Sequence, residues 1–411
     1  MKKPLVIVSG ALANKPGNGG NAWTRLSWAR GFQRLGCEVF FVEQLPAAAS
    51  VPSVALSFFR DVIAQFGPAQ NSALLCGNEV LHGPSLTELI RRAKDAALLF
   101  NLSGHLTPPE IFSAARCKVY YDDDPGFTQF WHAQGANLRL AEHDFHFTIG
   151  ENIGVESCRR RGDEAQIEIR NRKLEIGNIL ETPPVGSYTD CPIPTGGIRW
   201  RHTRAPVVLA DWPVCAPKSF DRFTTIASWR GAFGPVTHEG KTYGLKCHEF
   251  RKFFALPQRV KQTCEVALQI HPADKKDLDA LRAHGWRVVE PQAVADSPDA
   301  FRRYVQNSAA EFSPAQGIYV DTNSGWFSDR TVRYLASGRP ALVQETGFSR
   351  HLPVGEGLLS FRNLEEAVDG AEQIARDYEL HCRAARKIAE EFFDSDKVIR
   401  KLADQVGLPL P

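Results

Sequence analysis

The stretch that decides the fold is residues 324–343, which read SGWFSDRTVRYLASGRPALV. A strand is expected to end in its glycine-containing turn, and Ser328 and Asp329 are residue types that cap the start of a helix. That helix stops at Gly338, and Pro340 opens the next strand. The order of strand, turn, helix and strand is typical of an α/β domain.

Outward from this stretch, strands and helices alternate through both halves of the chain. In the first half we expect a helix from about Ala22 and strands at 4–8, 39–42, 96–101, 118–121 and 146–150. In the second half we expect helices at about 246–255, 274–284, 298–307 and 327–337, and strands at 206–209, 223–227, 265–270, 286–289, 316–320, 340–344 and 357–361. This alternation predicts two Rossmann-like, doubly wound α/β domains.

The length of 411 residues also favours two domains, because it exceeds what one hydrophobic core usually holds. Residues 160–200 are mixed and polar, with proline and glycine pairs, as in a linker. We therefore expect an N-terminal domain over 1–185, a linker over 186–205, a C-terminal domain over 206–385 and terminal helices over 386–411.

Charge and cysteine usage narrow the functional classes. The net charge of +2 gives no electrostatic footprint for a duplex, so nucleic acid is an unlikely partner. The nine cysteines are scattered without a C-x-x-C pair, which argues against a disulfide framework and a structural zinc site. The apolar run at residues 5–8 is too short for a signal peptide or a membrane span. We expect a cytoplasmic protein with reduced thiols.

A loop rich in glycine and asparagine, residues 14–21, joins the first strand to the first helix. Glycines there let backbone N–H groups approach an anion at the helix N-terminus. The loop matches neither G-x-G-x-x-G nor a Walker A motif, so a plain turn is the alternative. If the loop binds a ligand, Gly19 and Gly20 are the residues expected to do so.

The segment Ala336-Ser337-Gly338-Arg339-Pro340, after a turn and a helix, resembles the C-terminal domain of GT-B glycosyltransferases. The resemblance covers roughly residues 205–405 and includes a Gly-x-Gly-Leu-Leu strand at 355–359. It implies two domains that face each other across a cleft, with the C-terminal helices packing back. In that family the helix N-terminus contacts the diphosphate of a nucleotide-sugar donor, which agrees with the dipole of a helix.

The resemblance also implies a set of donor contacts. Arg230 and Lys246 correspond to the basic pair that neutralises the diphosphate, Pro291 and Gln292 to a strand end that reads the nucleobase, and Glu345 to a contact with sugar hydroxyls. Aromatic side chains could support a sugar ring, although core packing is the alternative. The full expected donor set is Gly19, Gly20, Arg230, Lys246, Pro291, Gln292, Ser324, Trp326, Phe327, Ser328, Asp329, Arg330, Glu345, Thr346 and Gly347.

The sequence departs from the family pattern at two positions. Arg333 stands where related families often place a glutamate for the ribose hydroxyls, and Gly325 replaces a second glutamate eight residues earlier. The identity of the donor, of UDP or dTDP type, and the inverting or retaining course of transfer are therefore left open.

Three consecutive carboxylates, residues 122–124, follow a strand of the N-terminal half. One of them could deprotonate an acceptor hydroxyl, with Asp124 the first choice and Asp122 another. Asp124 could instead cap a helix. His105 follows a neighbouring strand and is a second candidate base, since imidazole titrates near neutral pH. The spacing of His132, His143 and His146 is not that of a helical metal site, and no metal is expected.

These features predict a metal-independent enzyme without a cofactor, which transfers a sugar from a nucleotide-diphosphate sugar to a hydroxyl of a small molecule or glycan. A nucleotide-sugar epimerase on the same scaffold is one alternative. A non-catalytic relative that binds sugar nucleotides or carbohydrate is another, because both family glutamates are missing.

Overall fold

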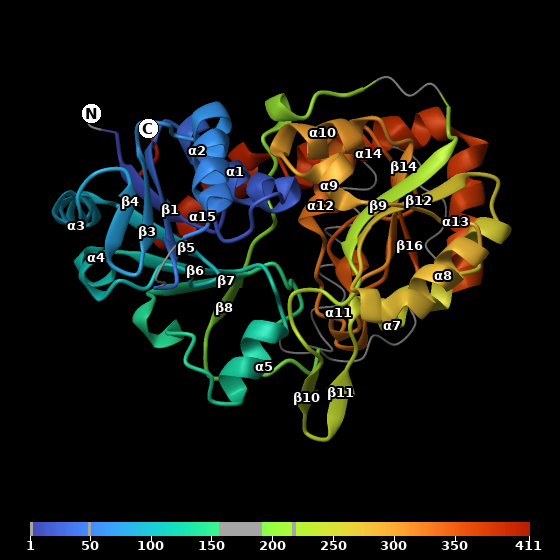
Figure 1. Ribbon diagram of the computed structural model, residues 1–411, viewed down its shortest axis with the longest axis horizontal. Coiled ribbons are helices and arrows are strands. Elements are labelled where there is room, and N and C mark those ends of the chain that lie inside the picture. Colours follow the sequence, from blue (N-terminus) through green and yellow to red (C-terminus); the bar gives the residue numbers. More distant parts are fainter. Residues whose placement is uncertain (1–2, 48–50, 156–190, 216–218) are drawn as a thin grey trace.

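The computed structural model describes residues 3–47, 51–155, 191–215 and 219–411. Figure 1 shows two lobes side by side, each built around a sheet flanked by helices. Both chain ends lie on the N-terminal lobe. Among the described residues, no helix has both the length and the apolar character needed to cross a bilayer.

The N-terminal lobe holds an eight-stranded sheet in the order β4-β3-β2-β1-β5-β6-β7-β8. Its pairs are parallel except β3 with β4. Strands such as β5 are buried on both faces, as expected where helices cover a parallel sheet. The strands are β1 (Leu5–Ser9), β2 (Glu38–Leu45), β3 (Ser72–Cys76), β4 (Glu79–His82), β5 (Leu98–Leu102), β6 (Lys118–Asp122), β7 (Phe145–Thr148) and β8 (Trp200–His202). The helices are α1 (Gly19–Arg34), α2 (Ser53–Phe66), α3 (Leu86–Asp95), α4 (Pro109–Ala114) and α5 (Phe127–Ala133).

The C-terminal lobe holds a six-stranded parallel sheet in the order β13-β12-β9-β14-β15-β16. The strands are β9 (Arg222–Ser228), β12 (Thr263–Gln269), β13 (Arg287–Val289), β14 (Ala310–Ser313), β15 (Ala341–Gln344) and β16 (Leu358–Phe361). A separate hairpin consists of β10 (Val236–His238) and β11 (Lys241–Tyr243). The helices are α7 (Lys246–Phe250), α8 (Lys275–Ala283), α9 (Pro291–Ala295), α10 (Pro298–Gln306), α11 (Gly317–Asp321), α12 (Asp329–Ala336) and α13 (Leu364–Arg376).

Two expected strands of the second half are wrong. Residues 316–320 lie in and around helix α11, and the strand before it is β14, at 310–313. A short apolar run does not distinguish a strand from a buried helix, and here Gly317 packs on the backbone of Gly244, where a Cβ would lie within 2.9 Å. Residues 206–209 form one isolated bridge, Val207 to Asp394, instead of a sheet strand.

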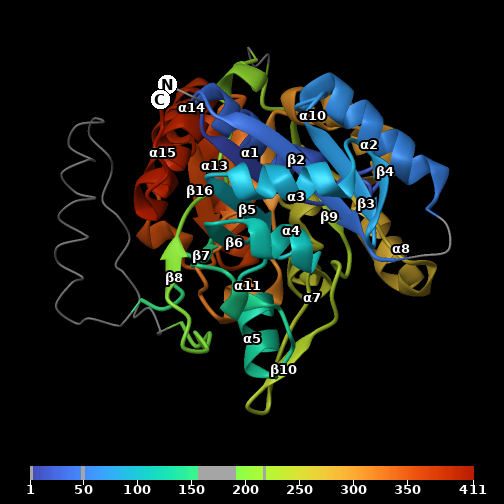
Figure 2. The ribbon, with the colours of Figure 1, turned by 90° about the vertical axis from the view of Figure 1, so that its left-hand side faces the viewer.

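The expected linker also needs correction. Residues 200–202, inside the range 186–205, form β8, which pairs in parallel with β7 and so belongs to the N-terminal sheet. Figure 2 shows β8 at the edge of that sheet. Residues 186–190 of the expected linker lie outside the described residues.

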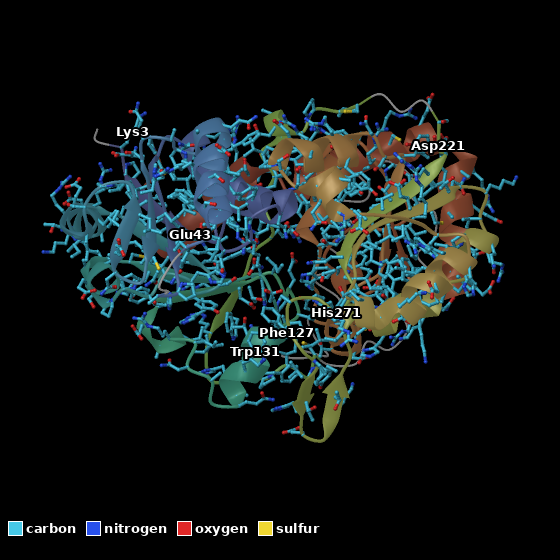
Figure 3. The ribbon with its side chains drawn as sticks, in the orientation of Figure 1. Lys3, Glu43, Phe127, Trp131, Asp221 and His271 are labelled. Atoms are coloured by element: carbon cyan, nitrogen blue, oxygen red, sulfur yellow. The ribbon has the colours of Figure 1, made fainter. Side chains whose placement is uncertain are left out.

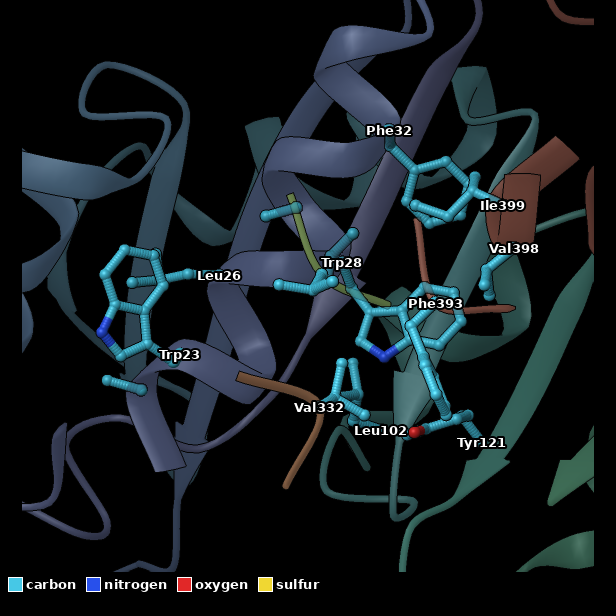
Figure 4. Close-up of a cluster of buried hydrophobic side chains, with 14 of the residues drawn as sticks. Trp23, Leu26, Trp28, Phe32, Leu102, Tyr121, Val332, Phe393, Val398 and Ile399 are labelled. Carbon is cyan, nitrogen blue, oxygen red and sulfur yellow. The ribbon is translucent and has the colours of Figure 1, made fainter. Parts of the chain in front are cut away.

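The last helix returns to the N-terminal lobe, whereas the helix before it stays on the C-terminal lobe. Helix α14 (Tyr378–Phe392) packs on α12, and α15 (Ser395–Val406) packs on α1. A Cβ on Gly31 of α1 would lie 2.3 Å from Cδ1 of Ile399 in α15, so a larger residue there would require the Ile399 side chain to move. Figure 4 shows Trp28, Phe32 and Tyr121 of the N-terminal lobe packed with Val332 and Phe393 from the second half of the sequence. One apolar core therefore spans both lobes.

Candidate functional site

The first contact between the lobes lies at the start of α1. The indole Nε1–H of Trp23 donates to the carbonyl oxygen of Pro298, 2.8 Å away, where α10 begins. A Cβ on Gly19 would lie 2.1 Å from a backbone oxygen just before α10, and one on Gly20 would lie 2.8 Å from the ring of Phe301. Gly19 and Gly20 thus have a packing role, because α10 fills the space beside them, and the ligand contact expected of their backbone N–H groups stays a prediction.

The second contact is the side chain of Asn152, which follows β7. Its Nδ2 donates to the carbonyl oxygens of Asn323 (2.7 Å) and Gly347 (3.3 Å), and His351 Nε2 lies 2.8 Å from its Oδ1. A Cβ would lie 2.4 Å from Nδ2 if placed on Gly347 and 2.8 Å from the Asn152 nitrogen if placed on Gly325. Gly347, expected beside the donor sugar, instead makes room for a side chain of the opposite lobe.

The third contact joins α5 to the β10–β11 hairpin. Phe130 stacks on Tyr243 with ring centroids 4.9 Å apart, and Gln134 Nε2 donates to the carbonyl oxygen of Thr237 at 2.7 Å. Figure 3 shows Phe127 and Trp131 on the side of α5 toward the hairpin, where both rings contact Phe233. Together the three contacts hold the carboxyl ends of the two sheets toward each other.

The C-terminal lobe places a buried cation at this junction. Lys246, the first residue of α7, donates from Nζ to the carbonyl oxygen of Pro314, 2.7 Å away, just beyond β14. Burial, and then the charge of Arg330, lower the pKa of Lys246 to about 7. The guanidinium of Arg330 is fixed by Glu311 (2.5 Å), Ser313 (2.7 Å) and the carbonyl oxygen of Ile226 (2.8 Å). Two cations beside the start of α12 form the chemistry of an anion site.

Arg230 does not complete this pair. Its guanidinium forms a bidentate ion pair with Asp274, with contacts of 2.8 and 2.6 Å, and remains largely exposed. The hydrogen bond to Asp274 raises the pKa of Arg230 above its usual value. The cation whose charge reaches Lys246 is Arg330, which lies on α12, whereas Arg230 is engaged by Asp274 at the start of α8.

The first turn of α12 faces the N-terminal lobe. Asp329 accepts a hydrogen bond from Thr24 of α1 and forms an ion pair, 2.9 Å, with Arg333. Burial alone would raise the pKa of Asp329, but Arg333 and Thr24 lower it below the usual value. Asp329 therefore joins the lobes. Ser328 is buried and its hydroxyl caps no N–H group, so the first turn keeps its backbone donors free of a side-chain cap.

The two aromatic candidates for the donor site have different surroundings. Phe327 stacks on Phe393 with centroids 5.3 Å apart and belongs to the shared core, so it is a packing residue. Trp326 is half-buried and stacks on Tyr319 at 4.4 Å. The hydroxyl of Tyr319 in turn donates to Asp124 Oδ1, 3.3 Å away on the opposite lobe. Trp326 thus lies next to the candidate base.

The remaining donor candidates lie around the ends of β15 and β13. Glu345 Oε1 accepts from the backbone N–H of Gly347 at 2.7 Å, and its Oε2 is buried without a partner. The hydroxyls of Thr346 and Ser324 serve the loop itself, because they bond to the backbone of Trp326. Pro291 and Gln292 begin α9, with Gln292 exposed.

Asp122 and Asp124, two residues apart, have opposite surroundings. Asp122 is buried and accepts hydrogen bonds from Thr128 (2.7 Å), Gln129 (2.8 Å) and Thr148 (2.8 Å). It has no free acceptor for a substrate and is a structural residue. Asp124 accepts the hydrogen bond from Tyr319, and burial followed by the charges of Asp123 and Asp122 raises its pKa to about 7. A carboxylate that titrates near neutral pH matches the requirement of a general base.

His105 lies in a loop with left-handed backbone at Ser103 (φ 52°) and Gly104 (φ 69°). Burial, and then the charge of Arg25, lower the pKa of His105 to about 4. The ring is therefore neutral at physiological pH and suits a hydrogen-bond partner for a ligand more than the principal base.

Sequence reasoning missed several residues of this junction. Glu43, at the end of β2, accepts from the backbone N–H groups of three residues of the β1–α1 loop, at 2.8 Å each, and so shapes that loop. Arg25 lies on the buried face of α1, and a Cβ on Gly10 would lie 2.6 Å from its Cγ. An arginine among the apolar residues of α1 was the available signal. Tyr319 was hidden because its segment was expected to be a strand. Within the described ranges, no group of three or more potential ligands could hold a metal ion.

Comparison with known sequences finds no match for this chain, whereas comparison with solved structures finds several. No protein-family model and no curated protein matches the chain. An alpha-glucosyltransferase in complex with UDP-glucose and DNA containing an abasic site matches with a TM-score of 0.60 and 10% identity, over 98% of this chain and 99% of that one. HepE of Anabaena in complex with UDP-glucose matches with a TM-score of 0.56 and 10% identity, over 98% and 99%. AviGT4, a glycosyltransferase involved in avilamycin A biosynthesis, matches with 0.52 and 12%, over 98% and 97%.

These likenesses extend over both lobes, so they concern the whole arrangement and not one Rossmann-like half. One of these structures contains DNA. The expectation that nucleic acid is an unlikely partner, which rested on net charge, therefore finds no support in the comparisons.

Proposed function

We propose that this chain, which has the GT-B fold of glycosyltransferases, transfers a sugar from a nucleotide-diphosphate sugar to a hydroxyl group of a small molecule or glycan. The observation that carries the proposal is the buried Lys246 next to Arg330 at the start of α12. Glu311 compensates the charge of Arg330, whereas Lys246 has no ion pair within the described residues and bonds only to a carbonyl oxygen. A buried ammonium group without an ion pair is costly unless an anion compensates it. A diphosphate supplies that charge.

In this proposal the donor diphosphate lies against Lys246 and the free N–H groups of the first turn of α12. Both stabilise the charge that builds up on the leaving diphosphate during transfer. Arg330 contributes through its field, because its hydrogen bonds already hold it in place. A UDP donor is favoured, since UDP or UDP-glucose is bound in the similar structures.

Asp124 is the proposed general base. It belongs to the N-terminal lobe, which is where the acceptor would bind, and it contacts Tyr319 of the C-terminal lobe. Base and donor site therefore come together only when the lobes are in contact. Catalysis without a metal stays a prediction, as does a location in the cytoplasm.

The test is a nucleotide panel followed by a transfer assay. UDP, dTDP and GDP are titrated against the protein while the midpoint of thermal unfolding is recorded. We expect UDP to raise the midpoint, and Lys246→Ala to abolish that rise. No shift with any of the three nucleotides would count against the proposal. Incubation with UDP-glucose alone is the control, since isomerisation without an acceptor would indicate an epimerase.

A further inference from the structure

The unexplained feature of the N-terminal lobe is a group of charges at the switch point of its sheet. The strand order β2-β1-β5-β6 reverses direction between β1 and β5. Open α/β sheets bind ligands in the crevice beyond the carboxyl ends of the strands at such a point. Here the two loops beyond β1 and β5 carry Lys15, which is exposed, and His105. The charge of Arg25, on α1, lowers the pKa of both groups.

Arg25 is short of partners for a buried guanidinium. Its side chain is 6% exposed, and its single ion pair in the described residues is Nη2 to Asp123 Oδ2, at 3.4 Å. Its Nε is buried without a hydrogen-bond partner. Asp123 is also shared, because Ser103 donates to it. Buried guanidinium groups usually have most of their N–H donors satisfied, and each unsatisfied one costs free energy.

The charges around Arg25 leave a surplus on the cationic side. Asp329 is committed to Arg333 and Thr24. Asp124 is only about half ionised at pH 7, because its pKa is raised to about 7 by burial and by Asp123 and Asp122. Loss of hydration around the Lys15 ammonium, followed by the charge of Arg25, lowers the pKa of Lys15. The charges of Asp123, Asp124 and Asp329 act to raise this pKa and offset only part of the decrease. Glu43 also interacts electrostatically with Arg25, but its oxygens accept from three backbone N–H groups of the β1–α1 loop. Of the nearby described carboxylates, only Asp123 therefore forms an ion pair with Arg25.

We infer that Arg25 and Lys15 form an oxyanion subsite on the N-terminal lobe, which binds a phosphate or carboxylate group of the acceptor. The inference rests on the proposed function and adds the chemical class of its acceptor: a hydroxyl compound with an anionic group. His105, held neutral, offers a ring nitrogen to the same ligand. The acceptor hydroxyl would then lie toward Asp124, one residue from the Asp123 carboxylate that faces Arg25.

The test uses inorganic phosphate and acetate as probes, with UDP at saturation so that the donor site is filled. We expect phosphate, or acetate if the subsite prefers carboxylates, to raise the unfolding midpoint above the value with UDP alone. Arg25→Gln should weaken the apparent affinity at least about tenfold, and Lys15→Met several-fold. Arg34→Gln, on the exposed end of the same helix, is the matched control and should leave it unchanged.

A purely structural role for Arg25 predicts a different pattern. If the anion competes with Asp123 for Arg25, Asp123→Asn should tighten phosphate binding, because it removes the competitor and a repulsive charge. If Arg25 serves only to pair with Asp123, the same variant lowers stability and leaves phosphate binding absent. Binding of neither probe, or equal binding by wild type, Arg25→Gln and Lys15→Met, would overturn the subsite. Loss of the UDP shift with the phosphate shift retained would instead contradict the donor site.

Discussion

The two walls of the interlobe junction use their cations in different ways. On the C-terminal side, Lys246 and Arg330 are fixed by hydrogen bonds to the backbone and to Glu311 before any ligand arrives. On the N-terminal side, Arg25 has one loose ion pair and an unpaired Nε. The first arrangement is preorganised, which lowers the cost of binding. In our proposal, the anionic group of the acceptor completes the second.

This difference suggests a division of labour between a constant donor wall and an adaptable acceptor wall. Similar solved structures share the fold of this chain at 10–12% identity. In our proposal the donor wall binds the diphosphate, and the acceptor wall binds an anionic group of the acceptor. The predictions below test whether the two walls behave independently.

The largest effect is expected for Asp124→Asn on the rate of sugar transfer. Removal of a general base typically costs about 10²–10⁴-fold in kcat, while the affinity for UDP should stay unchanged because Asp124 lies on the other wall. Steady-state kinetics and UDP titration measure the two quantities. Asp122→Asn should differ by lowering the unfolding midpoint, because it disrupts a buried hydrogen-bond network. Wild-type transfer rates in Asp124→Asn would exclude the base.

The next largest effect is expected for Lys246→Ala on UDP binding. Loss of a charge-assisted contact of about 1.5–3 kcal/mol corresponds to roughly 10- to 150-fold in Kd. In this variant, phosphate should still raise the unfolding midpoint through the subsite that we assign to Arg25, provided that UDP is raised to saturation. If both shifts vanish together, the walls are not independent.

Titration of the two walls should give opposite pH dependences. Lys246 has a folded-state pKa lowered to about 7, so its charge is present below pH 7 and lost above it. Diphosphate favours the charged form, so UDP binding takes up a proton and Kd rises by up to about tenfold per pH unit above 7. Calorimetry in two buffers with different ionisation enthalpies measures the uptake, which should be absent in Lys246→Ala. Asp124 acts as a base only when ionised, so kcat should increase through pH 7.

A smaller effect is expected for Gly20→Ala, and on stability alone. Its Cβ would meet Phe301 at 2.8 Å, and overpacking of this kind costs about 1–3 kcal/mol. Thermal unfolding should show a midpoint several degrees lower. The affinity of the folded protein for UDP should be unchanged. Gly234→Ala is the control, because nothing lies within 4 Å of its Cβ. A loss of UDP binding without a loss of stability would support the phosphate-binding role that the sequence predicts for this loop.

The smallest effect is expected for Arg230→Ala. The ion pair of an exposed arginine, such as that of Arg230 with Asp274, contributes about 0–1 kcal/mol. UDP affinity, measured by the same titration, should change by less than about threefold. A loss comparable to that of Lys246→Ala would show that Arg230 turns toward the diphosphate when a donor binds.

Much of the fold was predictable because local patterns encode it. Buried strands such as β9, β12 and β15 follow from apolar runs, and helix α12 ends where Gly338 predicts, although the Ser328 side chain does not cap its start. The C-terminal site was partly predictable, since the start of α12 comes after strand β14 and α11, and Lys246 begins the helix after the β10–β11 hairpin. The strand expected at 316–320 failed because an apolar run as short as residues 318–320 fits either a strand or a helix.

The sequence alone determined two sheets with helices between them, and which residues end each strand, because both depend on periodicity and on turn residues close in the chain. Only the tertiary structure decided which of those residues share a site. Gly19, Gly20 and Gly347 lie in loops whose composition is typical of ligand binding. Yet a side chain or backbone from the other lobe fills the space where a Cβ on each of them would lie. Arg25, Lys15 and Asp123 gain a common role only because loops roughly 100 residues apart meet at one sheet edge. Such contacts depend on how the lobes pack, and packing over that distance leaves no local pattern.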